Sequence, residues 1–212
     1  MRTDSSDPIR LADYTVPSHL IENVHLDVTL DDVRTRVVAS LSIKPNPAAA
    51  QGPLILDGDE LELESISLDG KPLAPSHYTL TASTLTLTNP PAGLFTLSIV
   101  TRLNPAGNTK LMGLYRSSGI YCTQCEAEGF RRITYFPDRP DVMASYTVTL
   151  RADKRKYPVL LSNGNLVEHG ELPEGRHFAR WVDPHKKPSY LFALVAGQLV
   201  AREQRIRSRS GQ

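Results

Sequence analysis

Thiol, carboxylate and amide side chains gather in one short segment, and they are the first candidates for chemistry. Cys122, Gln124, Cys125, Glu126 and Glu128 follow one another closely along the chain. A CxxC pair can form a reactive disulfide or supply half of a zinc site. A structural zinc needs four ligands, and no second such pair is present, while a thioredoxin-like role would need a βαβ setting. We therefore expect two free thiols in a partly buried loop, with a redox switch as the alternative.

Histidines do not complete a metal site in this sequence. The six of them are scattered, and no His-Glu-x-x-His pair is present to bind zinc from one face of a helix. His169 and His177 are interpreted as surface or sheet residues. Walker A, G-x-G-x-x-G and G-x-S-x-G motifs are also absent. We expect no metal bound by this chain and no catalytic residue within it.

Charge and composition exclude some classes of partner. The 212 residues carry 24 Lys and Arg against 23 Asp and Glu, so the net charge of +1 gives no field that would attract nucleic acid or an anionic membrane. The apolar run from 190 to 197 is far shorter than the roughly 20 residues of a membrane span. The polar start, Met1 to Pro8, lacks the features of a signal peptide, and two cysteines are too few for a secreted disulfide framework. A cytoplasmic location is expected.

The elements that must position these side chains are strands. Apolar residues alternate from Val24 to Leu30 and again from Val37 to Ile43, which predicts an antiparallel hairpin. About ten short strands follow this pattern, and the continuous apolar run from Tyr190 to Ala196 predicts one buried on both faces. Short strands separated by Pro and Gly turns favour an all-β fold, a sandwich or a saddle-like pair of sheets.

Three stretches depart from the regular alternation. The apolar phase slips between Leu63 and Ile66, which a β-bulge would explain. The interval from Asn108 to Asp141 shows no clean period, and an irregular segment within a regular scaffold is a common place for function. Four arginines between 202 and 209 alternate with other residues, and we interpret them as the solvated face of a strand leading out of the domain.

Several motifs together resemble the bacterial aminopeptidase N family, zinc exopeptidases of the gluzincin class that include alanyl aminopeptidase. The resemblance covers nearly all of the chain and is carried by five stretches: Gly113–Ser117, Thr123–Arg131, Ile133–Asp141, Leu160–Asn165 and Lys187–Gly197. In that family the matching region is an N-terminal, saddle-like β-sandwich of mostly antiparallel and mixed sheets. The resemblance therefore implies a domain over residues 1–197, with 198–212 forming a strand or linker toward a catalytic domain that this chain lacks.

The resemblance also implies which residues meet the substrate. By position in the motif, Gln124 and Glu126 would bind the free amino terminus of a peptide, with Glu126 as the anchor and Gln124 lining the pocket for the first side chain. An ammonium group has three donors and a full charge, so a carboxylate is a suitable partner. Asp138 and Pro140 match the family as structural turn residues. From the residues alone, Glu126 is better interpreted as an ordinary surface carboxylate, and Glu128 could take its place.

The zinc and the catalytic motifs of the family would lie in the missing domain. The implied partners are peptides with a free amino terminus and the catalytic domain of the same enzyme, and the 212-residue chain alone is expected to be inactive. A stand-alone, non-catalytic β-sandwich binding module is the alternative function. Continuation of the reading frame into the missing motifs would distinguish the two.

Overall fold

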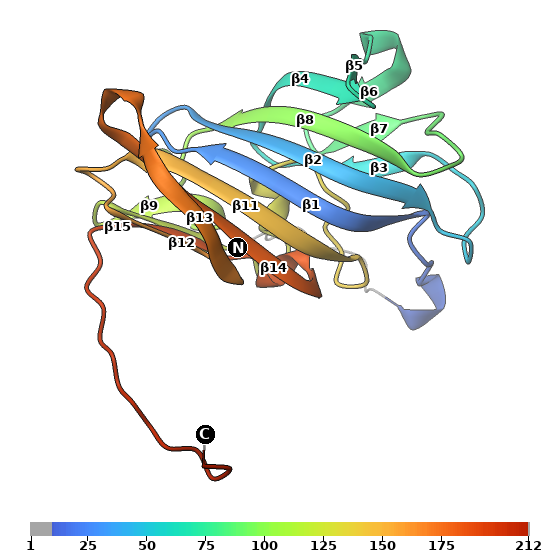
Figure 1. The fold of residues 1–212 in the computed structure, drawn as a ribbon. Helices are drawn as coiled ribbons and strands as arrows, with labels where there is room; N and C mark the ends of the chain where they lie inside the picture. Colours follow the sequence, from blue (N-terminus) through green and yellow to red (C-terminus); the bar gives the residue numbers. More distant parts are fainter. Residues whose placement is uncertain (1–9, 212) are drawn as a thin grey trace.

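Three β-sheets make up the described part of the chain, residues 10–211 of the computed structural model. The prediction made for Met1 to Pro8 lies outside these residues. The large sheet has eight strands in the order β13-β14-β11-β1-β2-β8-β4-β5. Smaller sheets in the orders β12-β15-β10-β9 and β3-β7-β6 accompany it. Figure 1 shows the four-stranded sheet beneath one end of the large sheet.

The strands are separated by short turns and by 3-10 helices of three residues. The strands are β1 His19–Thr29, β2 Thr35–Pro45, β3 Leu54–Asp57, β4 Glu62–Leu68, β5 Lys71–Pro72, β6 Tyr78–Leu80, β7 Thr84–Leu87, β8 Phe95–Leu103, β9 Gly113–Ser117, β10 Ile120–Gln124, β11 Met143–Asp153, β12 Val159–Ser162, β13 Asn165–Leu172, β14 Arg176–Pro188 and β15 Leu194–Gly197. The 3-10 helices are η1 Leu11–Asp13, η2 Pro75–His77, η3 Phe130–Arg132, η4 Pro173–Gly175 and η5 Ser189–Leu191. Within residues 10–211, no helix has the length and apolar character that crossing a bilayer requires.

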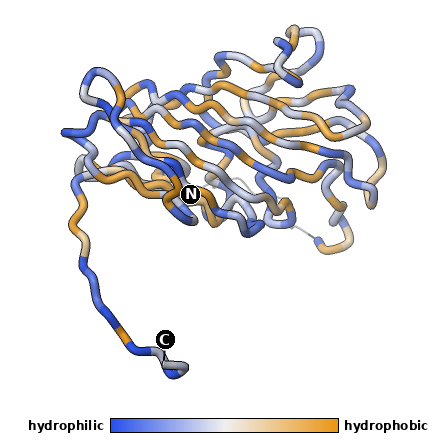
Figure 2. Tube along the Cα trace, viewed as in Figure 1, coloured by the Kyte–Doolittle hydropathy of each residue, from blue (hydrophilic) through white to orange (hydrophobic). Residues whose placement is uncertain are grey.

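Period-two alternation determines which residues form the core. In β2 every second side chain from Thr35 to Ile43 is buried, and β1 pairs with it as the predicted antiparallel hairpin. β1 is also parallel to β11, so the large sheet is mixed. Figure 2 shows the resulting apolar colouring along the strands. One hydrophobic core joins residues from all three sheets, and the all-β, sandwich-like prediction is confirmed.

The bulge prediction is also confirmed, whereas the strand predicted from Tyr190 to Ala196 is wrong over its first half. The pairing of β4 with β8 shifts register between Leu63 and Ser65. Pro188 ends β14, and the chain then turns through η5, where Leu191 is 51% exposed. The strand β15 begins only at Leu194. The apolar run thus reflects a turn followed by a short strand, not one strand buried on both faces.

A hairpin within the irregular interval was not predicted. β9 and β10 pair as neighbours, and the two residues between them, Ser118 and Gly119, both have positive φ angles of 49° and 81°. Two such residues form the type I′ turn that suits a tight hairpin. The Ser-Gly pair is therefore the feature of the sequence that could have predicted this hairpin. This hairpin matters because β10 ends at Gln124.

Residues 198–211 contain no strand, so the interpretation of their arginines as one face of a strand is wrong. In Figure 1 this segment leaves the four-stranded sheet and runs away from the rest of the chain. No cross-strand partner pairs with it, and Val200 is 98% exposed. Its role as a linker to a further domain stays a prediction.

A partly buried polar cluster ties the four-stranded sheet to the large one. The hydroxyls of Tyr121 and Tyr157 each donate to Oδ1 of Asp32 at 2.8 Å, and Arg116 Nη1 lies 2.9 Å from the other oxygen. Asp32 belongs to the turn between β1 and β2, whereas Tyr121 and Arg116 belong to β10 and β9. Burial disfavours the charged form of Asp32, but the two hydroxyls and Arg116 outweigh it and lower its pKa. The cluster therefore fixes the hairpin that carries Gln124.

We predict that Asp32→Ala lowers the free energy of unfolding by about 1–3 kcal/mol, because two tyrosine hydroxyls lose their acceptor. Urea denaturation would measure this. Since the folded-state pKa is lowered, the contribution of Asp32 is present above its unfolded pKa near 3.9 and is lost as the pH falls through the folded value. The double variant with Tyr157→Phe should lose less than the sum of the two single losses. Simple additivity would contradict direct coupling.

Candidate functional site

The segment after β10 places two carboxylates on the surface of a tight turn. Cys125 is buried, whereas Gln124, Glu126 and Glu128 are exposed. The amide of Gly129 donates to the carbonyl of Cys125 at 2.8 Å, which closes the turn. Gln124 Nε2 donates to the backbone carbonyl of Glu126 at 3.2 Å. The two predicted substrate-binding residues therefore lie together on one turn.

The buried carboxylate of Asp138 holds the next segment in place. It accepts from the backbone amide of Arg131 at 3.1 Å and from its Nε at 3.2 Å. Its other oxygen accepts from the hydroxyl of Ser189, and its own amide donates to Asp57 Oδ2 at 3.0 Å. Asp138 thus joins η3, η5 and the end of β3, and it has the structural role expected for it.

Arg132 makes a second attachment of η3. Its guanidinium bonds to the carboxylates of Asp59 and Glu60, and Nε donates to the carbonyl of Met112 at 3.1 Å. The arginine side chain is 6% exposed, and the two carboxylates that compensate its charge remain accessible to water. Neither arginine is predicted from the sequence as a site residue, although the chain has this adjacent pair and acidic residues at 57, 59 and 60.

The two candidate carboxylates differ in their partners. Glu128 lies 3.4 Å from Arg131 Nη2 and is therefore paired within the chain. The carboxylate of Glu126 forms no hydrogen bond or ion pair with any residue from 10 to 211. A rigid turn that leaves one carboxylate exposed and unpaired presents an acceptor to a cationic ligand.

Glycine at position 129 is required by a close approach of backbone. A Cβ atom there would lie 2.3 Å from the carbonyl oxygen of Gln124 and 2.9 Å from Cα of Cys125. Backbone atoms cannot move aside as a flexible side chain could, so any side chain at 129 would displace the turn.

We predict that Gly129→Ala destabilises the chain by about 1–3 kcal/mol through this overlap. Gly93→Ala is the matched control, because its Cβ would meet no atom within 4 Å. Chemical denaturation of both variants would compare them. Equal unfolding free energies for the two would show that the turn accommodates a side chain.

Burial explains the state of the two cysteines. Both are free, with Cys125 2% exposed and Cys122 partly exposed on β10. Burial raises the pKa of both thiols, and the nearby charge of Asp138 raises that of Cys125 further. A raised pKa removes the thiolate that reacts with oxidants and disulfides. The geometry favours free thiols over a redox switch.

We predict that Cys125 does not react with Ellman's reagent in the folded chain and that Cys122 reacts slowly. Both should react fully in denaturant, because unfolding exposes them and restores an ordinary pKa. Formation of an intramolecular disulfide in the native chain under mild oxidant would contradict this.

The donor set does not fit a zinc ion. Among residues 10–211, no three His, Cys, Asp or Glu side chains are grouped so that they could hold a metal. The six histidines are dispersed as the sequence suggested: His169 is exposed on β13, and His177 contacts the carbonyl of Tyr157 at 2.8 Å. We therefore assign no metal-dependent step to residues 10–211.

Comparison with known proteins agrees with this architecture. Residues 16–191 match the model of the peptidase M1 N-terminal domain. Aminopeptidase N of Caulobacter vibrioides is 52% identical over 199 residues, covering 94% of this chain and 23% of the relative. Aminopeptidase N of Escherichia coli is 46% identical over 200 residues, covering 94% and 22%. The chain thus spans about a quarter of the length of these relatives.

Solved structures show the same fold. Legionella pneumophila aminopeptidase A, in complex with aspartic acid, superposes with a TM-score of 0.92 at 38% identity, over 96% of this chain and 24% of that one. An M1 zinc metallopeptidase mutant from Deinococcus radiodurans, bound to a Tyr-Ser-Ala substrate, gives a TM-score of 0.73 at 16% identity, over 85% and 42%. With a matching domain model, close relatives and a shared fold, this chain belongs to the peptidase M1 N-terminal domain family.

Proposed function

We propose that this chain is the N-terminal domain of a zinc-dependent aminopeptidase and that Glu126 and Gln124 hold the free amino terminus of a peptide substrate. The observation that carries the proposal is the exposed carboxylate of Glu126, which has no partner among residues 10–211. The names of the relatives, aminopeptidase N and aminopeptidase A, support the reaction class.

The chemistry of the site suits an ammonium group. A protonated amine offers three donors and a positive charge, and a carboxylate that accepts from it forms a charge-assisted hydrogen bond. Gln124 would line the pocket for the first side chain, and its amide already bonds to the carbonyl of Glu126. A fixed anchor would place the first peptide bond at one distance from the catalytic groups, so that one residue is removed at a time.

The catalytic groups belong to another part of the enzyme in this proposal. Zinc, when bound there, would polarise the scissile carbonyl and activate water. Residues 10–211 supply no ligand set for it, so the chain alone is proposed to bind but not to hydrolyse. The matched region covers 23% of the Caulobacter vibrioides relative, and the rest of that protein is long enough to contain such a domain.

An apolar face beside Gln124 supports a covering domain. The four-stranded sheet packs one face into the core through residues such as Leu160, Tyr121 and Ala196. On its other face a row of half-buried or exposed side chains crosses all four strands: Leu161, Val195, Cys122 and Tyr115. We name this row the outer row. Gln124 follows Cys122 on the same face of β10, so a domain that covered the outer row would also reach the candidate anchor.

We predict that Glu126→Ala lowers kcat/KM of the aminopeptidase carrying this domain by roughly 10- to 150-fold, because one charge-assisted hydrogen bond to the substrate is lost. Glu128→Ala is the matched control, since Glu128 is paired with Arg131. Steady-state kinetics with an alanyl amide would compare them. Equal effects of the two substitutions would remove the basis for assigning Glu126.

The outer row generates a second prediction. Leu161→Lys should leave the unfolding free energy of the isolated chain within about 0.5 kcal/mol, because Leu161 is 38% exposed there. In the longer enzyme it should cost about 2 kcal/mol or more, since a charge would be buried between domains. Leu80→Lys, on β6 of the three-stranded sheet, is the control and should be neutral in both. The same cost for Leu161→Lys in both proteins would show that nothing covers the outer row.

A further inference from the structure

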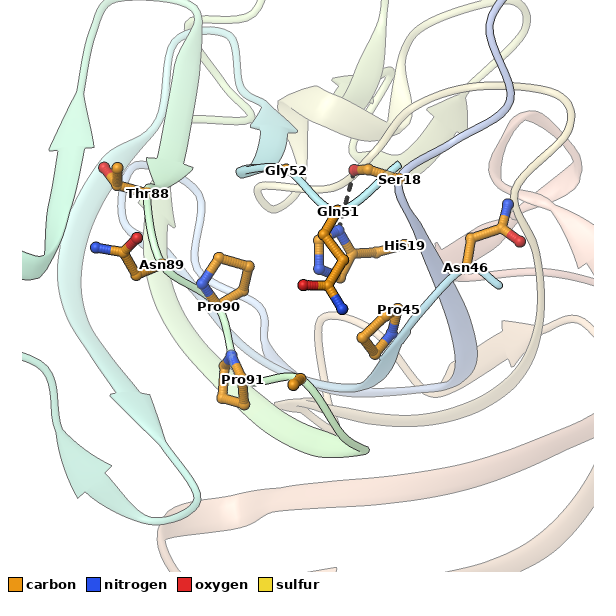
Figure 3. A pocket seen from close by; sticks show the side chains of 11 residues that line it. Ser18, His19, Pro45, Asn46, Gln51, Gly52, Thr88, Asn89, Pro90 and Pro91 are labelled. Carbon is orange, nitrogen blue, oxygen red and sulfur yellow. Dashed lines mark hydrogen bonds between the residues drawn. The ribbon is translucent and has the colours of Figure 1, made fainter. Parts of the chain in front are cut away.

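One cavity of the chain has neither Gln124 nor Glu126 among its lining residues. It has a volume of about 280 Å³ and opens where β1 begins, between the end of β2 and the loop that joins β7 to β8. Figure 3 shows His19 within it, with the rings of Pro45, Pro90 and Pro91 forming part of the wall. Gln51 and Gly52, from the segment before β3, complete another side. We name this space the proline-walled cavity.

The hydrogen bonds of His19 define what it offers to a ligand. Ser18 Oγ lies 3.0 Å from His19 Nδ1 and 3.3 Å from the carbonyl oxygen of Pro53. With its single proton donated to the carbonyl of Pro53, Ser18 Oγ can only accept from the ring, and we therefore assign the proton of the neutral imidazole to Nδ1. In this tautomer of the neutral ring, Nε2 carries a lone pair and is an acceptor.

Nothing among residues 10–211 uses that acceptor. His19 is 4% exposed, and its one side-chain hydrogen bond is the contact with Ser18. Phe95 and the imidazole ring meet edge to face, with ring centroids 6.4 Å apart. Burial also lowers the pKa of His19, so the ring remains uncharged at neutral pH. Because His19 lines the cavity and Nε2 has no protein donor among these residues, a ligand donor that enters can bond to it in place of water.

The walls of the cavity combine proline rings with uncharged polar side chains. No Lys, Arg, Asp or Glu of the described chain is among its lining residues, whereas the adjoining pocket, which shares His19, contains Glu128 and Arg131. Proline rings lack an N–H and pack well against aromatic rings, as in the recognition of proline-rich segments. An engineered apolar cavity of about 150 Å³ already holds benzene, so 280 Å³ is enough for a substituted ring.

We propose that the proline-walled cavity binds an uncharged aromatic group that carries one hydrogen-bond donor, a phenol or an indole. The ring lies against Pro45, Pro90 and Pro91, and its O–H or N–H donates to Nε2 of His19. Neither Gln124 nor Glu126 lines the cavity, so this proposal does not depend on the proposed function.

Titration of the 212-residue chain with p-cresol and with toluene, followed by amide chemical shifts, tests this. Both probes have the same ring and methyl group, and only p-cresol has a donor. We expect saturable shifts around His19 and binding of p-cresol roughly three- to tenfold tighter than toluene, the range of one hydrogen bond. N-acetyl-L-tyrosinamide distinguishes the source: tighter binding than p-cresol indicates a peptide-borne ring, and weaker binding indicates a small phenol.

Two variants test separately the contribution of the His19 acceptor and that of the cavity volume. His19→Leu should make p-cresol and toluene bind equally, and Gly52→Leu should abolish both, because a Cβ at Gly52 meets no atom within 4 Å and the side chain can fill the cavity. His77→Leu is the control, since His77 also contacts a preceding serine but is exposed. Equal binding of the two probes to the unaltered chain, or binding unchanged by Gly52→Leu, would overturn the proposal. Neither result bears on Glu126.

Discussion

The buried carboxylate of Asp138 is the interaction on which the candidate site depends. It receives the backbone and side chain of Arg131 on one oxygen and Ser189 on the other. These contacts fix η3 directly after the turn that carries Glu126. They also bring Arg131 to Glu128, so one of the two exposed carboxylates is neutralised within the chain and the other is left for a ligand.

The turn is held from its other end by the scaffold. Asp32 binds Tyr121 in β10, and Thr123 exchanges hydrogen bonds with the backbone of Leu194, so two side chains attach the strand that delivers Gln124. A site built between two fixed elements loses little freedom when a ligand binds. The outer row crosses this strand at Cys122, which is the surface that the proposed covering domain would contact.

Much of the scaffold could be predicted from the sequence because alternation reports directly on burial, as in β1 and β2. The hairpin β9–β10 was not predicted because its strands do not alternate cleanly between polar and apolar residues. The only local indication of a hairpin was the turn at Ser118 and Gly119. The strand predicted from Tyr190 was wrong over its first half because apolar character alone does not distinguish a 3-10 turn from a strand. The position of Gln124 and Glu126 came from the resemblance, while the pairing of Glu128 and the attachments of Arg131 and Arg132 are long-range contacts that no local pattern encodes.

The central claim is that this chain supplies an anchor for the substrate but no catalyst. The most direct test is hydrolysis of an alanyl or leucyl chromogenic amide by the purified 212-residue chain with added zinc, together with intact-mass and metal analysis. The account predicts no turnover and no stoichiometric zinc. Metal-dependent turnover that persists after contaminating peptidases are removed would contradict it, because the chain would then contain a catalytic metal site.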